Sequence, residues 1–231
     1  MSTTVGETGA DYLSVNVGLG AVATDAITAT LLLLALFKQL RSDRYVPWIY
    51  WSTIVLLSVV GTQMTDALTD YFGVSLYFST AAFSAVLASL FGVWFWREGT
   101  LSIADITTRN RELYYWAAIL FTFALGTAAG DLATEELGLG FRVGVFVFSG
   151  LIAAVALMGR FGASPVLTFW LAYILTRPLG ASLGDWLSQA QTYGGLGLGN
   201  VHTSLAFLGT IVILVFMVTL AERRSGSRKL F

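Results

Sequence analysis

Long apolar segments alternate with short polar ones along most of the chain. Seven segments of about 18 to 23 residues carry almost no charge, and each is long enough to cross the roughly 30 Å core of a bilayer as a helix. Residues 1–16 have only a short apolar stretch, which predicts half a helix. The predicted full spans are residues 18–37, 47–66, 74–96, 113–131, 141–158, 166–185 and 201–220. The pattern predicts an all-α polytopic membrane protein with seven full transmembrane helices and an N-terminal half-helix.

A short motif recurs at the same end of every second helix. It reads Gly, four residues, Asp, any residue, Leu or Ala, and then Ser or Thr. Its copies begin at Gly6, Gly61, Gly126 and Gly180, which are 54 to 65 residues apart. Self-similarity at a near-constant spacing indicates a repeat architecture. We therefore predict four two-helix repeats, at about residues 1–44, 45–111, 112–162 and 163–221, followed by a basic tail at residues 222–231.

The basic residues lie on one side of the predicted spans. Of the 13 Lys and Arg residues, 11 fall in the tail or near the loops that follow the second helix of a repeat. The positive-inside rule makes these loops cytoplasmic, so all four motifs face outward. Repeats in one orientation are related by an axis along the membrane normal. An aromatic belt is expected near the cytoplasmic ends, formed by Trp48, Trp51, Trp94, Trp96 and Trp116.

Composition agrees with a membrane protein and narrows the chemistry. Charged residues make up 12% of the chain, against roughly 25% in soluble domains. The chain has no cysteine, which excludes disulfides and thiolate metal sites. It also has no ATP-binding motif and no recognisable nucleophile–base set, so we expect neither an enzyme nor a bound cofactor. The expected partners are the lipid bilayer and a small ion or small molecule, and not nucleic acid.

The repeated Asp residues are the main candidates for a binding site. Parallel repeats would bring them toward a common centre, and carboxylates with nearby hydroxyl groups suit Mg²⁺, Mn²⁺, Ca²⁺ or protons. Crowded carboxylates compete to stay ionised, so such a ring would be able to exchange protons for a cation. The candidate ion-binding and metal-binding carboxylates are Asp11, Asp66, Asp131 and Asp185. Accompanying polar residues of the motif are Glu7, Ser14, Thr69, Thr134 and Ser188.

A structural interpretation of the same motif stays open. The Asp and the following Ser or Thr would then hydrogen-bond the next helix and fix the geometry of the repeat. Small residues in membrane helices let neighbouring helices approach closely. The glycines expected at such contacts are Gly6, Gly61, Gly126, Gly130, Gly180 and Gly184.

Arg177 breaks the repeat pattern near the middle of a predicted span. The other repeats have Thr3, Ser58 and Phe123 at this position. A permanent charge inside the membrane requires a partner. We expect an ion pair with Asp25 or Asp185, and alternatives are an anionic substrate or a role as a tethered counter-ion.

His202 is the only histidine of the chain and lies at the outer start of the last span. Its imidazole suits a metal ligand or a pH sensor. The alternative is an interfacial side chain with no role in a site.

Two stretches carry a family resemblance, residues 5–11 (Val-Gly-Glu-Thr-Gly-Ala-Asp) and residues 176–185 (Thr-Arg-Pro-Leu-Gly-Ala-Ser-Leu-Gly-Asp). They resemble the signature of a family of bacterial membrane-anchored proteins built from a repeat of unknown function. The resemblance implies a multi-pass inner-membrane protein of four repeats, with eight spans in the complete pattern. It implies no activity. The positive-inside rule places the basic tail, and with it the C-terminus, in the cytoplasm.

Three functional hypotheses follow from these patterns. The leading one is a secondary transporter for a cation, such as a divalent metal that is exchanged for protons. The Asp residues would be the ligands, and Arg177 would tune the site. The second is a membrane scaffold or accessory protein whose polar centre is structural. The third is binding of a small anionic ligand at Arg177.

Overall fold

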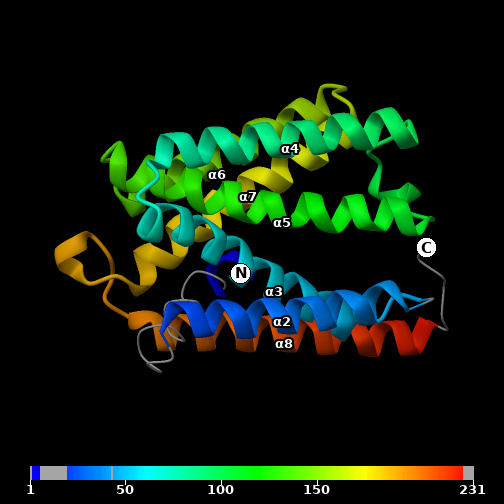
Figure 1. Ribbon diagram of the computed structural model, residues 1–231, viewed down its shortest axis with the longest axis horizontal. Helices are drawn as coiled ribbons and strands as arrows, with labels where there is room; N and C mark the ends of the chain where they lie inside the picture. The colour runs from blue at the N-terminus through cyan, green and yellow to red at the C-terminus, as the bar shows by residue number, and fades with distance from the viewer. Residues whose placement is uncertain (1, 6–19, 43, 226–231) are drawn as a thin grey trace.

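The computed structural model describes residues 2–5, 20–42 and 44–225. It confirms the all-α class: the described part contains no strand, and residues 2–5 are helical. Figure 1 shows the seven long helices lying roughly along one direction. They are α2 (Ala21–Leu40), α3 (Pro47–Asp66), α4 (Leu76–Glu98), α5 (Arg109–Asp131), α6 (Phe141–Arg160), α7 (Pro165–Ser188) and α8 (Gly199–Ser225).

Six of the seven long helices are apolar and long enough to cross a membrane, which makes this a multi-pass membrane protein. The seventh, α3, is 20 residues long but carries several polar residues. It packs against α2, α5 and α8, so much of its surface meets protein rather than lipid. The peripheral helices expose large apolar side chains, among them Leu33, Phe78, Phe146 and Ile213.

The connecting loops sort to the two ends of the bundle. Residues 44–46, 99–108 and 161–164 lie at one end with the end of α8, and we call this the basic end. The turns that follow the three described Asp motifs lie at the opposite end, the Asp end (Figure 1). Every repeat therefore runs in the same direction through the bundle.

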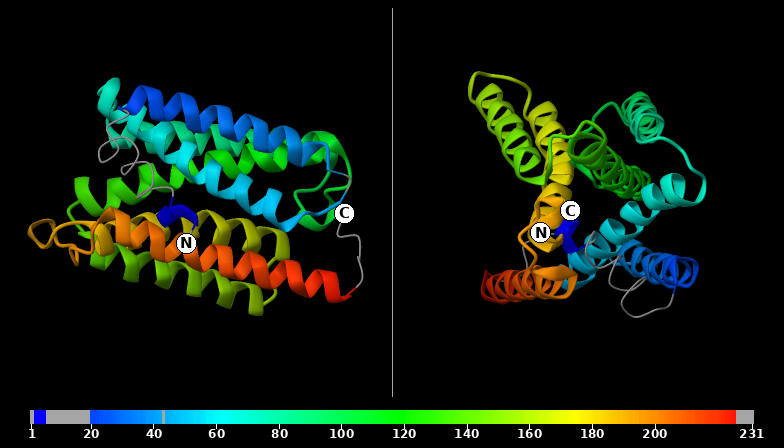
Figure 2. Two further views of the ribbon diagram at one scale, coloured as in Figure 1. Left: turned by 90° about the horizontal axis from the view of Figure 1, so that it is seen from below. Right: turned by 90° about the vertical axis from the view of Figure 1, so that its left-hand side faces the viewer.

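The helices form a pinwheel around a central axis (Figure 2, right). The inner helices α3, α5 and α7 pack on one another in succession, while α2 packs on α3, α4 on α5 and α6 on α7. Each of these three outer helices thus packs on the inner helix of the next repeat. The N-terminal segment closes the ring between α7 and α3. The Thr4 hydroxyl donates to the carbonyl oxygen of Gly180 at 3.0 Å, and the Ser58 hydroxyl donates to that of Ser2 at 2.7 Å.

The outer helix α8 packs on α7, the inner helix of its own repeat, and on α3. It also meets the N-terminal segment, where Val5 packs against Ile211 and Val215. Nearer the basic end, an apolar groove of about 210 Å³ lies between α3 and α8 and includes Trp51 and Leu208 in its wall.

Local signals explain where the helices begin and end. Pro47 and Pro165 occupy the first positions of α3 and α7, where a missing N–H costs nothing. The hydroxyl of Thr108 accepts a hydrogen bond from the N–H of Arg111 and caps α5. Gly99 ends α4 in the left-handed conformation, with φ 71°. These signals all lie at the basic end of the bundle.

The predicted aromatic belt is wrong for two of its members. Trp94 and Trp116 are buried in a core cluster with Trp170, whose indole N–H donates to the Leu101 carbonyl oxygen at 2.9 Å. Trp96, by contrast, is 79% exposed and suits a membrane interface. Position along a span cannot tell these cases apart, because the difference lies in which side of the helix meets protein.

Candidate ion site on the bundle axis

Two pairs of equivalent residues from neighbouring repeats touch each other. The hydroxyl oxygens of Tyr50 and Tyr115 are 2.6 Å apart, and each residue lies 11 positions before its motif Gly. The hydroxyl oxygens of Thr62 and Thr127 are 3.1 Å apart, and each residue directly follows its motif Gly. Equivalent atoms that a rotation axis relates lie closer together the nearer they are to that axis. Both contacts therefore lie close to the axis that relates the repeats.

These contacts identify the face of each inner helix that lines the axis. Residues four positions apart share one face of a helix, with a rise of about 6 Å per step. Counted from the motif Gly, positions −11, −7, −3, +1 and +5 form a row along each inner helix that turns by about 40° around the helix at each step. The five layers, from the basic end to the Asp end, are Tyr50, Tyr115 and Phe169; Ile54, Ile119 and Tyr173; Thr3, Ser58, Phe123 and Arg177; Thr62, Thr127 and Ala181; and Asp66, Asp131 and Asp185.

The motif glycines allow the inner helices to approach closely enough to form these layers. A Cβ on Gly180 would lie 2.6 Å from that of Thr3, and one on Gly61 or Gly126 would overlap the Cβ of Phe123 or Arg177. In each case the glycine of one repeat meets the residue three positions before the glycine of the next. The same contact therefore recurs around the ring.

The other two described glycines of the predicted set are placed differently. A Cβ on Gly130 would make an ordinary contact with Ala181, and Gly184 is buried on α7. Gly6 lies outside the described residues.

Three of the four predicted Asp residues lie on described helices, and their spacing from the motif Gly assigns them to the outermost layer. Asp185 is buried, whereas Asp66 and Asp131 are half-buried. Each of the three makes a hydrogen bond or an electrostatic interaction. Their carboxylates lie one turn outward from the layer of Thr62 and Thr127. The fourth carboxylate, Asp11, lies outside the described residues, as do Glu7 and Ser14.

A π-helix directly follows the Asp in two repeats, a feature that sequence reasoning missed. The segments are η2 (Ala67–Tyr71) and η4 (Leu132–Glu136), and they occupy equivalent positions. Such widened turns often occur at functional sites. In the fourth repeat α7 instead continues as an α-helix to Ser188, which is buried. The repeated Asp motif was the only sequence signal near these turns.

The last residue of the motif bonds to its own helix. The Thr69 hydroxyl donates to the carbonyl oxygen of Thr65 at 3.1 Å, and the Thr134 hydroxyl donates to that of Gly130 at 2.9 Å. Each hydroxyl proton is thus used in a hydrogen bond within the helix. The lone pairs of the hydroxyl oxygen remain available to bind a cation.

Arg177 lies in the middle layer of the axis and is 5% exposed. Its guanidinium carbon is 3.8 Å from the ring centroid of Phe123 and 4.1 Å from that of Tyr173. The guanidinium group therefore contacts two aromatic rings. Its Nε has no hydrogen-bond partner among the described residues. Tyr115 and Tyr50 lie within electrostatic reach of the charge.

The expected ion pairs of Arg177 are not formed. The one ion pair within the described ranges joins Arg111 and Glu98 at 2.8 Å. Asp185 lies two turns away, about 12 Å along the helix, and a helical side chain leans toward the N-terminus of its helix. The guanidinium group accordingly lies over Tyr173, on the side away from Asp185. Asp25 is on α2, which packs against α3.

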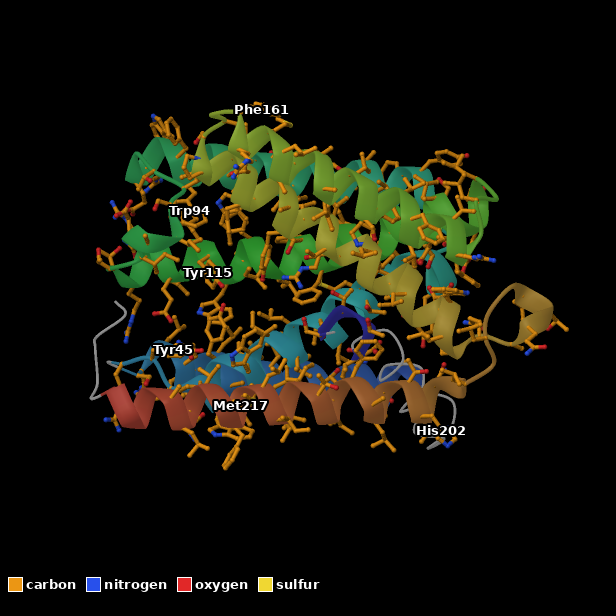
Figure 3. All side chains as sticks on the ribbon, turned by 180° about the vertical axis from the view of Figure 1, so that it is seen from behind. Tyr45, Trp94, Tyr115, Phe161, His202 and Met217 are labelled. Carbon is orange, nitrogen blue, oxygen red and sulfur yellow. The ribbon has the colours of Figure 1, made fainter. Side chains whose placement is uncertain are left out.

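The remaining polar candidate is peripheral. His202 is exposed at the Asp end, and its Nδ1 lies 3.1 Å from the carbonyl oxygen of Leu198 (Figure 3). In the part of the chain that the structure describes, no three His, Asp or Glu side chains come close enough to hold a metal ion.

The axis is closed toward the basic end. Ile54, Ile119 and Phe123 are buried there in one cluster with Tyr115 and Trp170. Figure 3 shows Trp94 and Tyr115 in this half of the bundle, away from His202. The arrangement thus combines a polar half near the Asp end with an aromatic half near the basic end.

Comparison with known proteins finds the same repeat. A family model described as Repeat of Unknown Function (DUF347) matches residues 1–45, 49–100, 114–161 and 168–224. No curated protein and no solved structure matches the chain. The four matches cover nearly the whole sequence and confirm the family resemblance of the two Gly-Asp stretches. The chain belongs to this family of proteins built from a repeat of unknown function.

Proposed function

We propose that this protein is a secondary transporter for a small cation, which binds on the bundle axis between the threonine and aspartate layers. The observation that carries the proposal is the contact of equivalent residues, Thr62 with Thr127 and Tyr50 with Tyr115. Each Asp lies four residues after the position of the Thr contact, about 40° around the helix, so its carboxylate is directed toward the same side as the threonines.

The chemistry of the two outer layers supports a cation or a proton as the substrate. Carboxylate and hydroxyl oxygens are the ligands that hard cations prefer. A carboxylate within a membrane span costs roughly 2.5 to 3.5 kcal/mol on insertion scales, so ionisable groups there are usually functional. Three repeats carry the Asp at an equivalent place on described helices.

The closed aromatic half supports alternating access as the mechanism. A transporter exposes its site to one side of the membrane at a time, with the other side sealed. In this structure the seal is at the basic end and includes the Tyr50–Tyr115 hydroxyl contact. The positive-inside rule makes that end cytoplasmic. We accordingly propose an inner-membrane protein with its C-terminus in the cytoplasm.

The same aromatic half favours one alternative, a scaffold or accessory membrane protein that transports nothing. A permanently sealed axis would make the Asp and Thr layers purely structural. Transport activity separates the two functions directly.

The test is cation flux in proteoliposomes. A pH-sensitive dye would report proton movement during addition of monovalent and divalent cations to vesicles that contain wild-type protein or Asp131→Asn. Loss of a charged ligand bond costs about 1.5 to 3 kcal/mol, so we expect the flux of the variant to fall by roughly tenfold or more. The matched control is Asp105→Asn, which changes an exposed carboxylate at the basic end.

Two results would count against the proposal. One is an absence of flux for every cation when the wild-type protein is folded. The other is an equal flux for wild type and Asp131→Asn, which would place the transport route away from the Asp layer.

A further inference from the structure

Arg177 carries a buried positive charge that the cation site does not use. The charge lies inside a helix that crosses the membrane, where an unpaired ion is expensive. Within the described ranges it has no acidic partner, because the one ion pair there joins Arg111 and Glu98. The two aromatic rings offset part of the cost, and the Tyr173 hydroxyl accepts a hydrogen bond from the group. The Nε donor still has no partner among the described residues.

The geometry around the guanidinium group selects the direction from which a ligand can bind. The rings of Phe123 and Tyr173 cover the guanidinium group at 3.8 and 4.1 Å, and only the Tyr173 hydroxyl also accepts a hydrogen bond from it. The edge carries the N–H donors, and the Nε donor is buried without a partner among the described residues. A ligand must therefore meet the guanidinium group edge-on and in its plane.

The position of Arg177 makes this edge part of the axis. It occupies the layer directly inward of the Thr62–Thr127 contact, and the other members of that layer include the short side chains of Thr3 and Ser58. The hydroxyl pair of Tyr50 and Tyr115 lies nearer the basic end and within electrostatic reach of the charge. The axis thus carries carboxylates at its outer layer and a single cationic side chain two layers further in.

We propose that the edge of Arg177 binds a small planar oxyanion, such as a carboxylate, bicarbonate or nitrate. Two parallel N–H groups of a guanidinium match two oxygens of a planar anion in a bidentate pair. A spherical halide offers no such pair, and a tetrahedral dianion would bring two charges to a site with one. The inference rests on the proposed transport axis, to which it adds an anion that accompanies the cation.

Equilibrium binding tests the anion site independently of transport. The purified full chain in lipid nanodiscs would be titrated with acetate, bicarbonate, nitrate, chloride and sulfate at constant ionic strength, with calorimetry as the readout. We expect saturable binding of the planar oxyanions and weaker binding of chloride and sulfate. Because this assay uses no gradient, its result does not depend on whether a cation is transported.

Three variants assign the signal to the Arg177 edge. Arg177→Leu should weaken binding of the planar anions by roughly tenfold or more. Arg177→Lys keeps a charge but loses the planar fork, so it should lose the preference for planar anions over chloride. The matched control Arg142→Gln removes an exposed basic residue and should bind as wild type does.

The outcomes separate this proposal from the transport proposal. Asp131→Asn should lose cation flux and retain anion binding if both are correct. The anion site is overturned if wild type binds none of the anions saturably. It is also overturned if Arg177→Lys keeps the wild-type order of anions, a result that remains readable if Arg177→Leu fails to fold.

Discussion

Arg177 shows how a single residue departs from the symmetry of the repeats. Thr3, Ser58 and Phe123 occupy its equivalent positions, so only one repeat places a charge at this depth. A ring of identical layers would treat all four helices alike. The exception makes one side of the axis cationic, and a polar function at this layer depends on this one helix.

Replacing Arg177 with Leu should stabilise the protein while abolishing anion binding. Removal of an unpaired charge from a membrane-spanning helix recovers roughly 2.5 to 3.5 kcal/mol on insertion scales. The loss of the two ring contacts lowers the free energy of unfolding by about 0.5 to 2 kcal/mol each. We expect a net gain of about 0.5 kcal/mol in the free energy of unfolding, measured by denaturant titration in mixed micelles. A loss of several kcal/mol would instead mean that the charge has a structural partner.

The contact between Tyr50 and Tyr115 can be tested by a double-mutant cycle. The variants are Tyr50→Phe, Tyr115→Phe and the double replacement, each compared for free energy of unfolding. A hydrogen bond across the axis predicts a coupling energy of about 0.5 to 1.5 kcal/mol. Strictly additive effects would show that the two hydroxyl groups do not interact, and the assignment of the axis would lose one of its two contacts.

Much of the residue-scale chemistry was predictable from the repeated motif. The candidate carboxylates Asp66, Asp131 and Asp185 follow from a motif that any alignment of the repeats exposes, and so does the odd position of Arg177. The partner of Arg177 was not predictable. Whether a charge meets a carboxylate or an aromatic ring depends on which helices are neighbours and on which way the side chain leans.

At the scale of helices, the motif glycines set the distance between neighbours. Gly126 meets the backbone and Cβ of Arg177, so the helices α5 and α7 touch at this point. Small residues allow such contact in membranes, where packing takes the place of the hydrophobic effect between helices. The glycine thereby also sets how close Arg177 lies to the axis.

Gly126→Ala should force α5 and α7 apart. The added methyl group overlaps the Cβ of Arg177, and overpacking of this kind costs about 1 to 3 kcal/mol. The matched control is Gly150→Ala in α6, where no described neighbouring atom lies within 4 Å of the added group. Thermal unfolding in detergent would compare the two variants. Equal melting temperatures for both would contradict the close contact.

The pairing of helices was beyond the reach of the repeat pattern. The outer helices α2, α4 and α6 pack on the inner helix of the following repeat. The short connections between α2 and α3 and between α6 and α7 favour this pairing, whereas the repeat pattern suggests that the two helices of one repeat pack together. The sequence unit and the packing unit are therefore offset by one helix.

At the scale of the whole molecule, orientation is the property most open to direct measurement. The chain has no cysteine, so single cysteines can be introduced without a background signal. We expect a membrane-impermeant thiol reagent to label Thr192→Cys at the Asp end in intact cells and to leave Ala104→Cys at the basic end unlabelled. Both positions are exposed in the structure. The reverse labelling pattern would place the C-terminus outside.

The sequence alone determined the number of long helices, the repeat and the common direction of the repeats. These properties follow from the length of apolar runs, the spacing of a motif and the placement of basic residues, all of which can be counted along the chain. Tertiary structure alone decided which face of each helix lines the axis, which helices pair, and what covers Arg177. The physical reason is that lipid and protein interior are both apolar, so the hydrophobicity of a membrane helix does not mark its inner face. Only the contacts between helices do so, beginning with Thr62 against Thr127.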